Sequence, residues 1–117
     1  MTTGKTKKTP KINSIALNKS KASLEEIIKL LRREIPELTS RYKIQSIGIF
    51  GSFVREERKK PQDLDVLVEF TRAPTLFEFI RLEKNLSEKI GLPVDLVMKS
   101  ALKPNIARRI LKEVIPL

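Results

Sequence analysis

Apolar positions in the first third of the chain recur at the spacing of an amphipathic helix. The stripe consists of Leu24, Ile27, Ile28, Leu31 and Ile35. Because residues three and four apart lie on the same face of a helix, this pattern predicts a helix with one buried side. Ser23 and Glu26 have the spacing of a capping box at its start, and Pro36 is predicted to mark its end.

Three shorter apolar runs, rich in Val, Ile and Leu, predict β-strands. They cover residues 44–50, 63–70 and 93–98. Further helices are predicted at residues 52–58, 75–90 and 100–115. The helix from 75 to 90 begins with a second capping box, formed by Thr75 and Glu78, and Gly91 follows its end. Its predicted stripe consists of Leu76, Phe79, Ile80, Glu83, Leu86 and Ile90.

The element order is α-β-α-β-α-β-α, which predicts an α+β fold with a small mixed sheet covered by helices on one face. The other face is expected to be partly open, and strand carboxylates can lie there. With 117 residues, the chain has the length of one domain. We expect this domain to span residues 23–117, after a basic and flexible lead-in at residues 1–22.

The composition excludes several kinds of chemistry. The chain contains no Cys and no His, so thiolate catalysis, imidazole catalysis and Cys- or His-based zinc sites are ruled out. A bound metal would have oxygen ligands, which favours Mg²⁺, Mn²⁺ or Ca²⁺. No apolar run approaches the ~20 residues that span a membrane, and the N-terminus lacks the apolar core of a signal peptide. We expect a cytoplasmic protein with no membrane partner.

The net charge is +10, and much of the excess lies in residues 1–24, which hold six Lys and no acidic residue. Such a segment is typical of a contact with nucleic acid or an acidic partner. It is also typical of a solvated segment without a partner, which is the commoner case. Nucleic acid is therefore not the favoured partner.

Two carboxylates stand two positions apart at the start of the second predicted strand. Residues at this spacing point to the same side of a strand, so Asp63 and Asp65 share the face opposite the apolar residues. Their charges, about 7 Å apart along the backbone, repel each other unless a cation or donor groups offset them. A third carboxylate, Asp95, lies in the otherwise apolar run PVDLVM. If the two strands are neighbours, the three carboxylates can converge on two divalent ions about 3.5–4 Å apart.

The turn between the first strand and the short helix has the features of an anion site. Gly51 lets the backbone approach a ligand without a Cβ in the way, and Ser52 can cap the helix and donate its hydroxyl. The N–H groups at the start of a helix attract phosphate, and Arg55 lies one turn further on. Phosphates at this turn and metal ions at the carboxylates together describe a nucleoside triphosphate with its Mg²⁺.

These residues resemble a known signature. Gly51-Ser52, ten further residues and then Asp63-Leu64-Asp65 match the GS-x10-D-x-D pattern of the nucleotidyltransferase superfamily of DNA polymerase β. The short length and the later Asp95 resemble its smallest branch, the minimal nucleotidyltransferase (MNT) antitoxins, over residues 24–117. One departure is Glu56, where many members have Gly.

The resemblance implies a nucleotidyltransferase fold and transfer of AMP from ATP, with pyrophosphate leaving. Asp63 and Asp65 would bind two Mg²⁺ ions, or Mn²⁺ in their place, and Asp95 would bind the catalytic ion and help deprotonate the acceptor. Gly51 and Ser52 would hold the β- and γ-phosphates. The implied acceptor is a tyrosine of a HEPN-domain ribonuclease toxin, which AMP transfer would silence.

Alternatives stay open at this point. The chain can be a binding module that neutralises a toxin by complex formation alone, or a nucleotidyltransferase that acts on RNA. The carboxylates can form a solvated strand face, with Asp95 in an ion pair, and an ion pair explains Arg55 as well as a phosphate does. Tyr42 is expected at the surface, on a strand edge. An apolar surface can serve a homodimer or a toxin, so the oligomeric state is not predicted.

Overall fold

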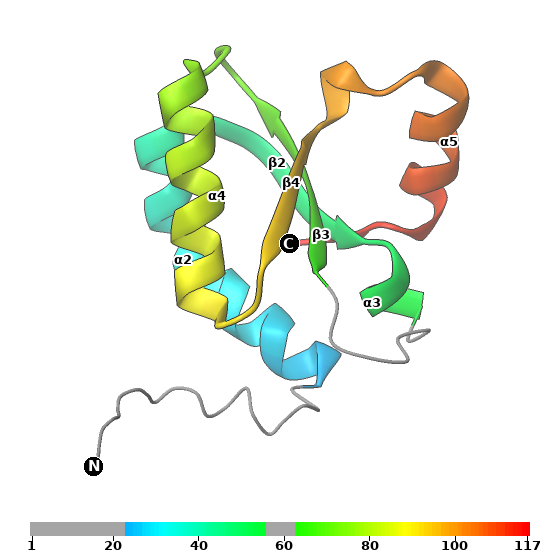
Figure 1. Ribbon diagram of the computed structural model, residues 1–117, viewed down its shortest axis with the longest axis horizontal. Helices are drawn as coiled ribbons and strands as arrows, with labels where there is room; N and C mark the ends of the chain where they lie inside the picture. The colour runs from blue at the N-terminus through cyan, green and yellow to red at the C-terminus, as the bar shows by residue number, and fades with distance from the viewer. Residues whose placement is uncertain (1–22, 56–62) are drawn as a thin grey trace.

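The chain folds around one mixed β-sheet, shown in Figure 1. The computed structural model describes residues 23–55 and 63–117. Its helices are α2 (Leu24–Tyr42), α3 (Ser52–Arg55), α4 (Leu76–Ile90) and α5 (Pro104–Glu113), with a 3-10 turn, η3, at Lys99–Ala101. Its strands are β2 (Ile44–Phe50), β3 (Leu64–Phe70), β4 (Val94–Met98) and β5 (Ile115–Pro116). The predicted lead-in at 1–22, the end of the predicted helix 52–58 and Glu56 lie outside the described residues.

The order of the strands in the sheet is β4-β3-β2-β5. Strand β2 runs antiparallel to both β3 and β5, whereas β3 and β4 are parallel. A parallel pair requires a crossover connection, and α4 provides it between β3 and β4. The predicted α+β fold with a small mixed sheet is therefore confirmed. The second and third predicted strands are neighbours, which meets the condition set for the carboxylates to converge.

The main core lies between the sheet and the helix pair α2 and α4, which lie side by side on one face of the sheet (Figure 1). Alternate residues of β3 point into this layer: Leu64, Val66 and Val68 are completely buried. They meet the buried faces of the two helices, which include Leu31 and Leu82. The alternation of β3 therefore fixes which face of the sheet is core and which face carries Asp63 and Asp65.

A second, smaller apolar cluster lies on the opposite face of the sheet, where α5 packs (Figure 1). Its buried members are Phe50 of β2, Leu67 of β3 and Ile110 of α5. The face that was expected to be partly open is thus covered over part of its area. The cover consists of α5 and the chain around it, so α5 lies on the same face as the carboxylates of β3 and β4.

Helix α2 does not end at Pro36, contrary to the prediction, but continues to Tyr42. A proline inside a helix removes one backbone hydrogen bond and crowds the carbonyl one turn earlier, which costs about 3 kcal/mol. The helix continues because Leu38 and Tyr42, only 2% and 7% exposed, extend its buried stripe beyond the proline. It ends at Lys43, whose left-handed backbone (φ 57°) forms the C-cap. The capping box of Ser23 and Glu26 at its start is confirmed.

Tyr42 is buried in the last turn of α2, so the prediction of a surface position was wrong. Its hydroxyl has no hydrogen-bond partner among residues 23–55 and 63–117. An unpaired buried hydroxyl loses its hydration without compensation, at a cost of about 1–3 kcal/mol. We therefore expect Tyr42→Phe to raise the free energy of unfolding by about 1 kcal/mol, measured by urea denaturation. A loss of stability of similar size would mean that the hydroxyl is hydrogen-bonded in solution.

Helix α4 begins and ends as predicted, with the capping box of Thr75 and Glu78 and with Gly91 in the left-handed C-cap (φ 81°). Leu86 and Ile90 of the predicted stripe enter the core, together with Leu82, which the prediction left out. Large apolar side chains of the first two turns remain at the surface: Leu76, Phe77 and Ile80 are 72%, 77% and 45% exposed. An exposed apolar patch of this kind is typical of a surface that contacts another protein.

The C-terminal segment differs from the single helix predicted at residues 100–115. It forms η3, then α5 with Pro104 at its start, and then the short strand β5. Strand β5 pairs with β2 opposite Gly48 and Ile49, and Leu117 N–H donates to the Ile47 carbonyl over 2.9 Å. A Cβ on Gly48 would stand 2.8 Å from the Ile115 carbonyl oxygen, so this glycine makes room for the returning chain.

Strand β4 forms one edge of the sheet, and side chains of α4 occupy part of that edge. Val94 N–H donates to Ser87 Oγ, and Leu96 N–H donates to Glu83 Oε2, both over 2.9 Å. Two amides of the edge strand are thus hydrogen-bonded from within the chain. In the described part of the chain, no helix has the length and apolar character needed to cross a membrane.

Candidate active site

The carboxylates come together at the start of the parallel strand pair. Asp65 of β3 lies directly beside Asp95 of β4 in the register, and Phe50 of β2 lies on the other side of Asp65. Neighbouring strands are about 4.8 Å apart, so the two carboxylates occupy adjacent places on one face of the sheet. Asp63 immediately precedes β3 and is exposed. These three residues are all the Asp residues of the chain.

The environment of Asp65 disfavours its negative charge. Asp65 is partly buried, and this burial is the largest cause that raises the pKa of its carboxyl above the ordinary value of 3.8. Asp95 and Asp63 raise the pKa further by repulsion, Glu113 adds a smaller increase, and Arg55 opposes them. An acid in this position is stabilised by a cation that offsets its neighbours, as expected for a metal-binding carboxylate.

The donor set fits Mg²⁺, because carboxylate oxygens are the ligands that this ion prefers. As the side chains are placed, residues 23–55 and 63–117 contain no group of three acidic, His or Cys residues that could hold a metal ion. The backbone register nevertheless puts Asp65 and Asp95 on neighbouring strands, with Asp63 on the same side of the chain.

Gly51 links the end of β2 to the carboxylates. Its backbone is left-handed, with φ of +86°, a conformation that residues with a Cβ rarely adopt. A Cβ at this position would stand only 2.1 Å from Asp65 Oδ2. From the sequence, Gly51 was interpreted as letting a ligand approach the backbone. The structure adds that the group nearest to this glycine's open side is the carboxylate of Asp65. The turn and the carboxylate therefore fit together as one unit.

Ser52 follows Gly51 as the first residue of α3, so the predicted strand-turn-helix arrangement is present. The short helix is anchored by Phe53, which is 3% exposed and packs into the main core. Arg55 N–H donates to the Gly51 carbonyl over 3.1 Å and closes the turn of α3. This turn brings the guanidinium of Arg55 back toward the N–H of Gly51.

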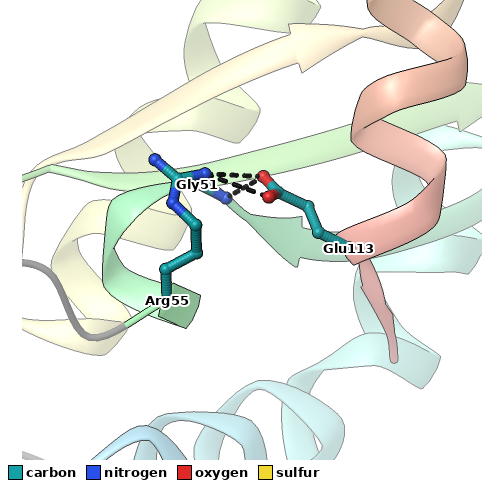
Figure 2. A network of polar contacts seen from close by, with 3 residues as sticks. All are labelled: Gly51, Arg55 and Glu113. Carbon is teal, nitrogen blue, oxygen red and sulfur yellow. Dashed lines mark hydrogen bonds and ion pairs between the residues drawn. The ribbon is translucent and has the colours of Figure 1, made fainter.

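The structure adds a residue that the sequence does not identify: Glu113, the last residue of α5. Figure 2 shows its carboxylate facing both Gly51 and Arg55. Gly51 N–H donates to Glu113 Oε2 over 2.9 Å, and Arg55 Nη1 lies 3.0 and 3.1 Å from the two carboxylate oxygens. Arg55 therefore forms an ion pair, which was one of its two interpretations from the sequence. The groups predicted to hold phosphates are in contact with a carboxylate of the same chain.

Only a weak signal in the sequence could have pointed to Glu113. Ile106, Ile110 and Glu113 follow one another at four- and three-residue spacing, so they share one face of α5. Ile110 is buried against the sheet, which places the glutamate on the same side. Its partners, however, are 58 and 62 residues away in the sequence, a separation that no local pattern encodes.

Comparison with known proteins assigns the chain to a family. The sequence profile of the family described as "Nucleotidyltransferase domain" matches residues 24–117. The protein adenylyltransferase MntA of Thermococcus cleftensis is 48% identical over 93 residues, which cover 80% of this chain and 94% of that protein. The matched region contains Gly51, Ser52 and the three Asp residues.

Solved structures agree with this relationship. The structure of a candidate minimal nucleotidyltransferase superposes with a TM-score of 0.68 and 34% identity, covering 79% of this chain and 94% of that chain. A Shewanella oneidensis complex of a tri-AMPylated HEPN toxin with an MNT antitoxin superposes with a TM-score of 0.51 and 25% identity, covering 79% of this chain and 66% of that chain. By profile, sequence and fold, the chain belongs to the nucleotidyltransferase domain family, as one of its minimal nucleotidyltransferases.

Proposed function

We propose that this nucleotidyltransferase transfers AMP from ATP to a tyrosine of a HEPN-domain toxin and thereby acts as its antitoxin. The observation that carries the proposal is the register of Asp65 beside Asp95, with Gly51 in contact with Asp65. This arrangement joins a carboxylate pair to the turn at the start of α3. The 48% identity to a protein adenylyltransferase supports the choice of reaction, and the likeness to an MNT antitoxin in complex with an AMPylated HEPN toxin supports the choice of partner.

Asp63, Asp65 and Asp95 would hold two Mg²⁺ ions, or Mn²⁺ in their place. Bound divalent ions supply the positive charge that stabilises the developing charge on the phosphates. Gly51 N–H, the Ser52 hydroxyl and Arg55 would bind the β- and γ-phosphates, and so fix the α-phosphate near the carboxylates. This orientation, with the acceptor oxygen in line with the leaving oxygen, is the main contribution that protein groups make to such a transfer.

The reaction itself is a displacement at the α-phosphorus of ATP. The tyrosine oxygen forms a bond to this phosphorus, the bond from the phosphorus to the bridging oxygen breaks, and pyrophosphate leaves with that oxygen. Asp95 takes the proton of the tyrosine hydroxyl. Its position on the exposed part of β4, beside Asp65, leaves it accessible to an acceptor from outside the chain.

Two features support a protein as the acceptor. The sheet and its helices use almost all of residues 24–117, so little of this region is left for a separate acceptor-binding domain. The exposed side chains of Leu76, Phe77 and Ile80 supply an apolar patch on α4 that a protein partner can cover. A partner that carries its own hydroxyl group to the carboxylates would complete the site.

The proposal is tested by mass spectrometry. The purified chain is incubated with ATP, Mg²⁺ and the product of its neighbouring gene as the candidate partner, whose mass is measured before and after. We expect the partner to gain the mass of one AMP or several, on tyrosine, and the gain to disappear with Asp65→Asn. A stable complex without any mass gain, with Mg²⁺ or Mn²⁺ and each of the four nucleoside triphosphates, would instead favour a binding module.

A further inference from the structure

Glu113 makes the contacts that the proposed function assigns to a phosphate. The N–H of Gly51 and the guanidinium of Arg55 are the donors expected to bind the triphosphate, and both are directed to this one carboxylate at 2.9–3.1 Å. Figure 2 shows the three groups converging on the same point. A carboxylate resembles a phosphate in carrying negative charge on oxygens that accept from a guanidinium fork and a backbone N–H.

We infer that Glu113 is an autoinhibitory residue that occupies the triphosphate-binding position and must swing away before ATP can bind. This inference rests on the proposed function, because it takes Gly51 and Arg55 as phosphate ligands. It goes beyond that function by assigning α5 a role in controlling access to the site. In the free protein, the two donors are held by Glu113, and the incoming nucleotide replaces it.

The surroundings of Glu113 allow the side chain to move while the backbone stays in place. The helix that carries it is fixed by Ile110, which is 8% exposed in the smaller apolar cluster. The chain after it is fixed to β2 by the hydrogen bond from Leu117 to Ile47. The side chain of Glu113 itself is 26% exposed and that of Arg55 is 43% exposed, so both have room to turn toward solvent.

The charges near Glu113 favour its release once a nucleotide arrives. Glu113 lies close enough to Asp65 to repel it, in a region that also holds the carboxylates of Asp63 and Asp95. Within residues 23–55 and 63–117, the hydrogen-bond and ion-pair partners of the Glu113 carboxylate are Gly51 and Arg55. When phosphate oxygens accept from those same donors, the Glu113 carboxylate loses its partners and is still repelled by Asp65. It then moves into water, where its charge is solvated.

The test is the affinity for ATP in the presence of Mg²⁺, measured by isothermal titration calorimetry on the full chain without a partner protein. Glu113→Gln keeps the size of the side chain and removes its charge. If the donors are open for only about a tenth of the time, the wild type binds about tenfold more weakly than its open form. We expect Glu113→Gln to lower the Kd for ATP by about tenfold and to lower the KM for ATP in the transfer assay.

Two further variants sharpen the comparison. Glu88→Gln makes the same chemical change at an exposed position of α4 and is expected to leave the Kd unchanged. Glu113→Asp keeps the charge but shortens the side chain by one methylene, so it is expected to compete less well with ATP and to fall between wild type and Glu113→Gln. Thermal unfolding of each variant verifies that it is folded. If Glu113→Gln does not fold, the affinity of Glu113→Asp for ATP decides the test.

The possible outcomes separate the inference from the function on which it rests. If the wild type binds ATP and transfers AMP, but Glu113→Gln binds ATP equally well, Glu113 does not compete and the inference fails alone. If Glu113→Gln binds ATP more weakly, Glu113 instead positions Arg55 for the nucleotide, and the inference is again overturned. If neither protein binds ATP or transfers AMP, the proposed function fails and the inference fails with it.

Discussion

Replacing Asp65 with Asn is expected to lower the rate of AMP transfer by about a thousandfold, because metal-assisted charge stabilisation contributes several kcal/mol at a phosphoryl centre and each 1.36 kcal/mol is a factor of ten. Asp65 is the central carboxylate of the site, with Asp95 beside it in the register and Gly51 packed against it. An amide has almost the same shape as a carboxylate but lacks the charge. The measurement is the initial rate of AMP incorporation into the partner, followed by mass spectrometry.

The same substitution is expected to leave the metal-free protein as stable as the wild type or more stable at neutral pH. The pKa of Asp65 is raised in the folded state, so its ionised form is disfavoured by the fold. This penalty is fully present above the raised pKa and disappears as the pH falls below the ordinary value of 3.8, where the carboxyl is neutral in both states. The stability advantage of Asp65→Asn should therefore shrink on acidification, as followed by urea unfolding at several pH values.

Glu88→Gln is the matched control for both measurements, since it makes the same change at an exposed helix position. It should leave transfer unchanged. Full transfer activity in Asp65→Asn would refute the assignment of the site. A large loss of stability at neutral pH would show that the carboxylate has stabilising contacts that outweigh the repulsion from its neighbours.

Gly51→Ala is expected to have the second large effect, on stability as well as on activity. A left-handed backbone costs a residue with a Cβ about 1–2 kcal/mol, and a steric overlap in a packed region adds about 1–3 kcal/mol. Here the overlap is with Asp65 Oδ2, only 2.1 Å from the added Cβ. We expect a total loss of about 3 kcal/mol in the free energy of unfolding, measured by urea denaturation.

A double-mutant cycle with Asp65→Ala separates the two causes. Without the carboxylate, the nearest remaining side-chain atom is the Cβ of residue 65, at 3.2 Å, so most of the overlap is relieved. Gly51→Ala should therefore cost clearly less in the Asp65→Ala background, leaving mainly the backbone term. Gly91, the C-cap of α4, has a similar positive φ of 81°. Gly91→Ala should therefore lower the free energy of unfolding by the same amount in both backgrounds. Equal costs for Gly51→Ala in both backgrounds would mean that the packing against Asp65 is not what requires the glycine.

The features that local patterns encode were predicted well. The two capping boxes, Gly91 and the three strands of the predicted sheet depend on residues within a few positions of one another, and each is present in the structure. The sequence placed Asp65 near Asp95 on the condition that their strands are adjacent, and the two strands do pair. Because side chains alternate along a strand, the face that carries the carboxylates was also fixed once the core residues of β3 were known.

The features that depend on distant contacts were missed. Pro36 has a strong local tendency to end a helix, and only the burial of Leu38 and Tyr42 against the rest of the core overrides it. Strand β5 has two residues, too few for any periodic pattern. Glu113 lies in an ordinary helical sequence, and its meeting with Gly51 is set by how α5 packs across the sheet. Sequence reasoning therefore located the carboxylates but not Glu113, which contacts Gly51 and Arg55 beside them.

The hydrogen bonds from β4 to Ser87 and Glu83 have a consequence for assembly. An edge strand with free amides invites another strand to extend the sheet, which is a common route to association and aggregation. At Val94 and Leu96 those amides are already used by α4, so an added strand would first have to break two internal bonds. A partner protein is therefore expected to dock through side chains on the helical surface, and the sheet itself remains closed to extension at this edge.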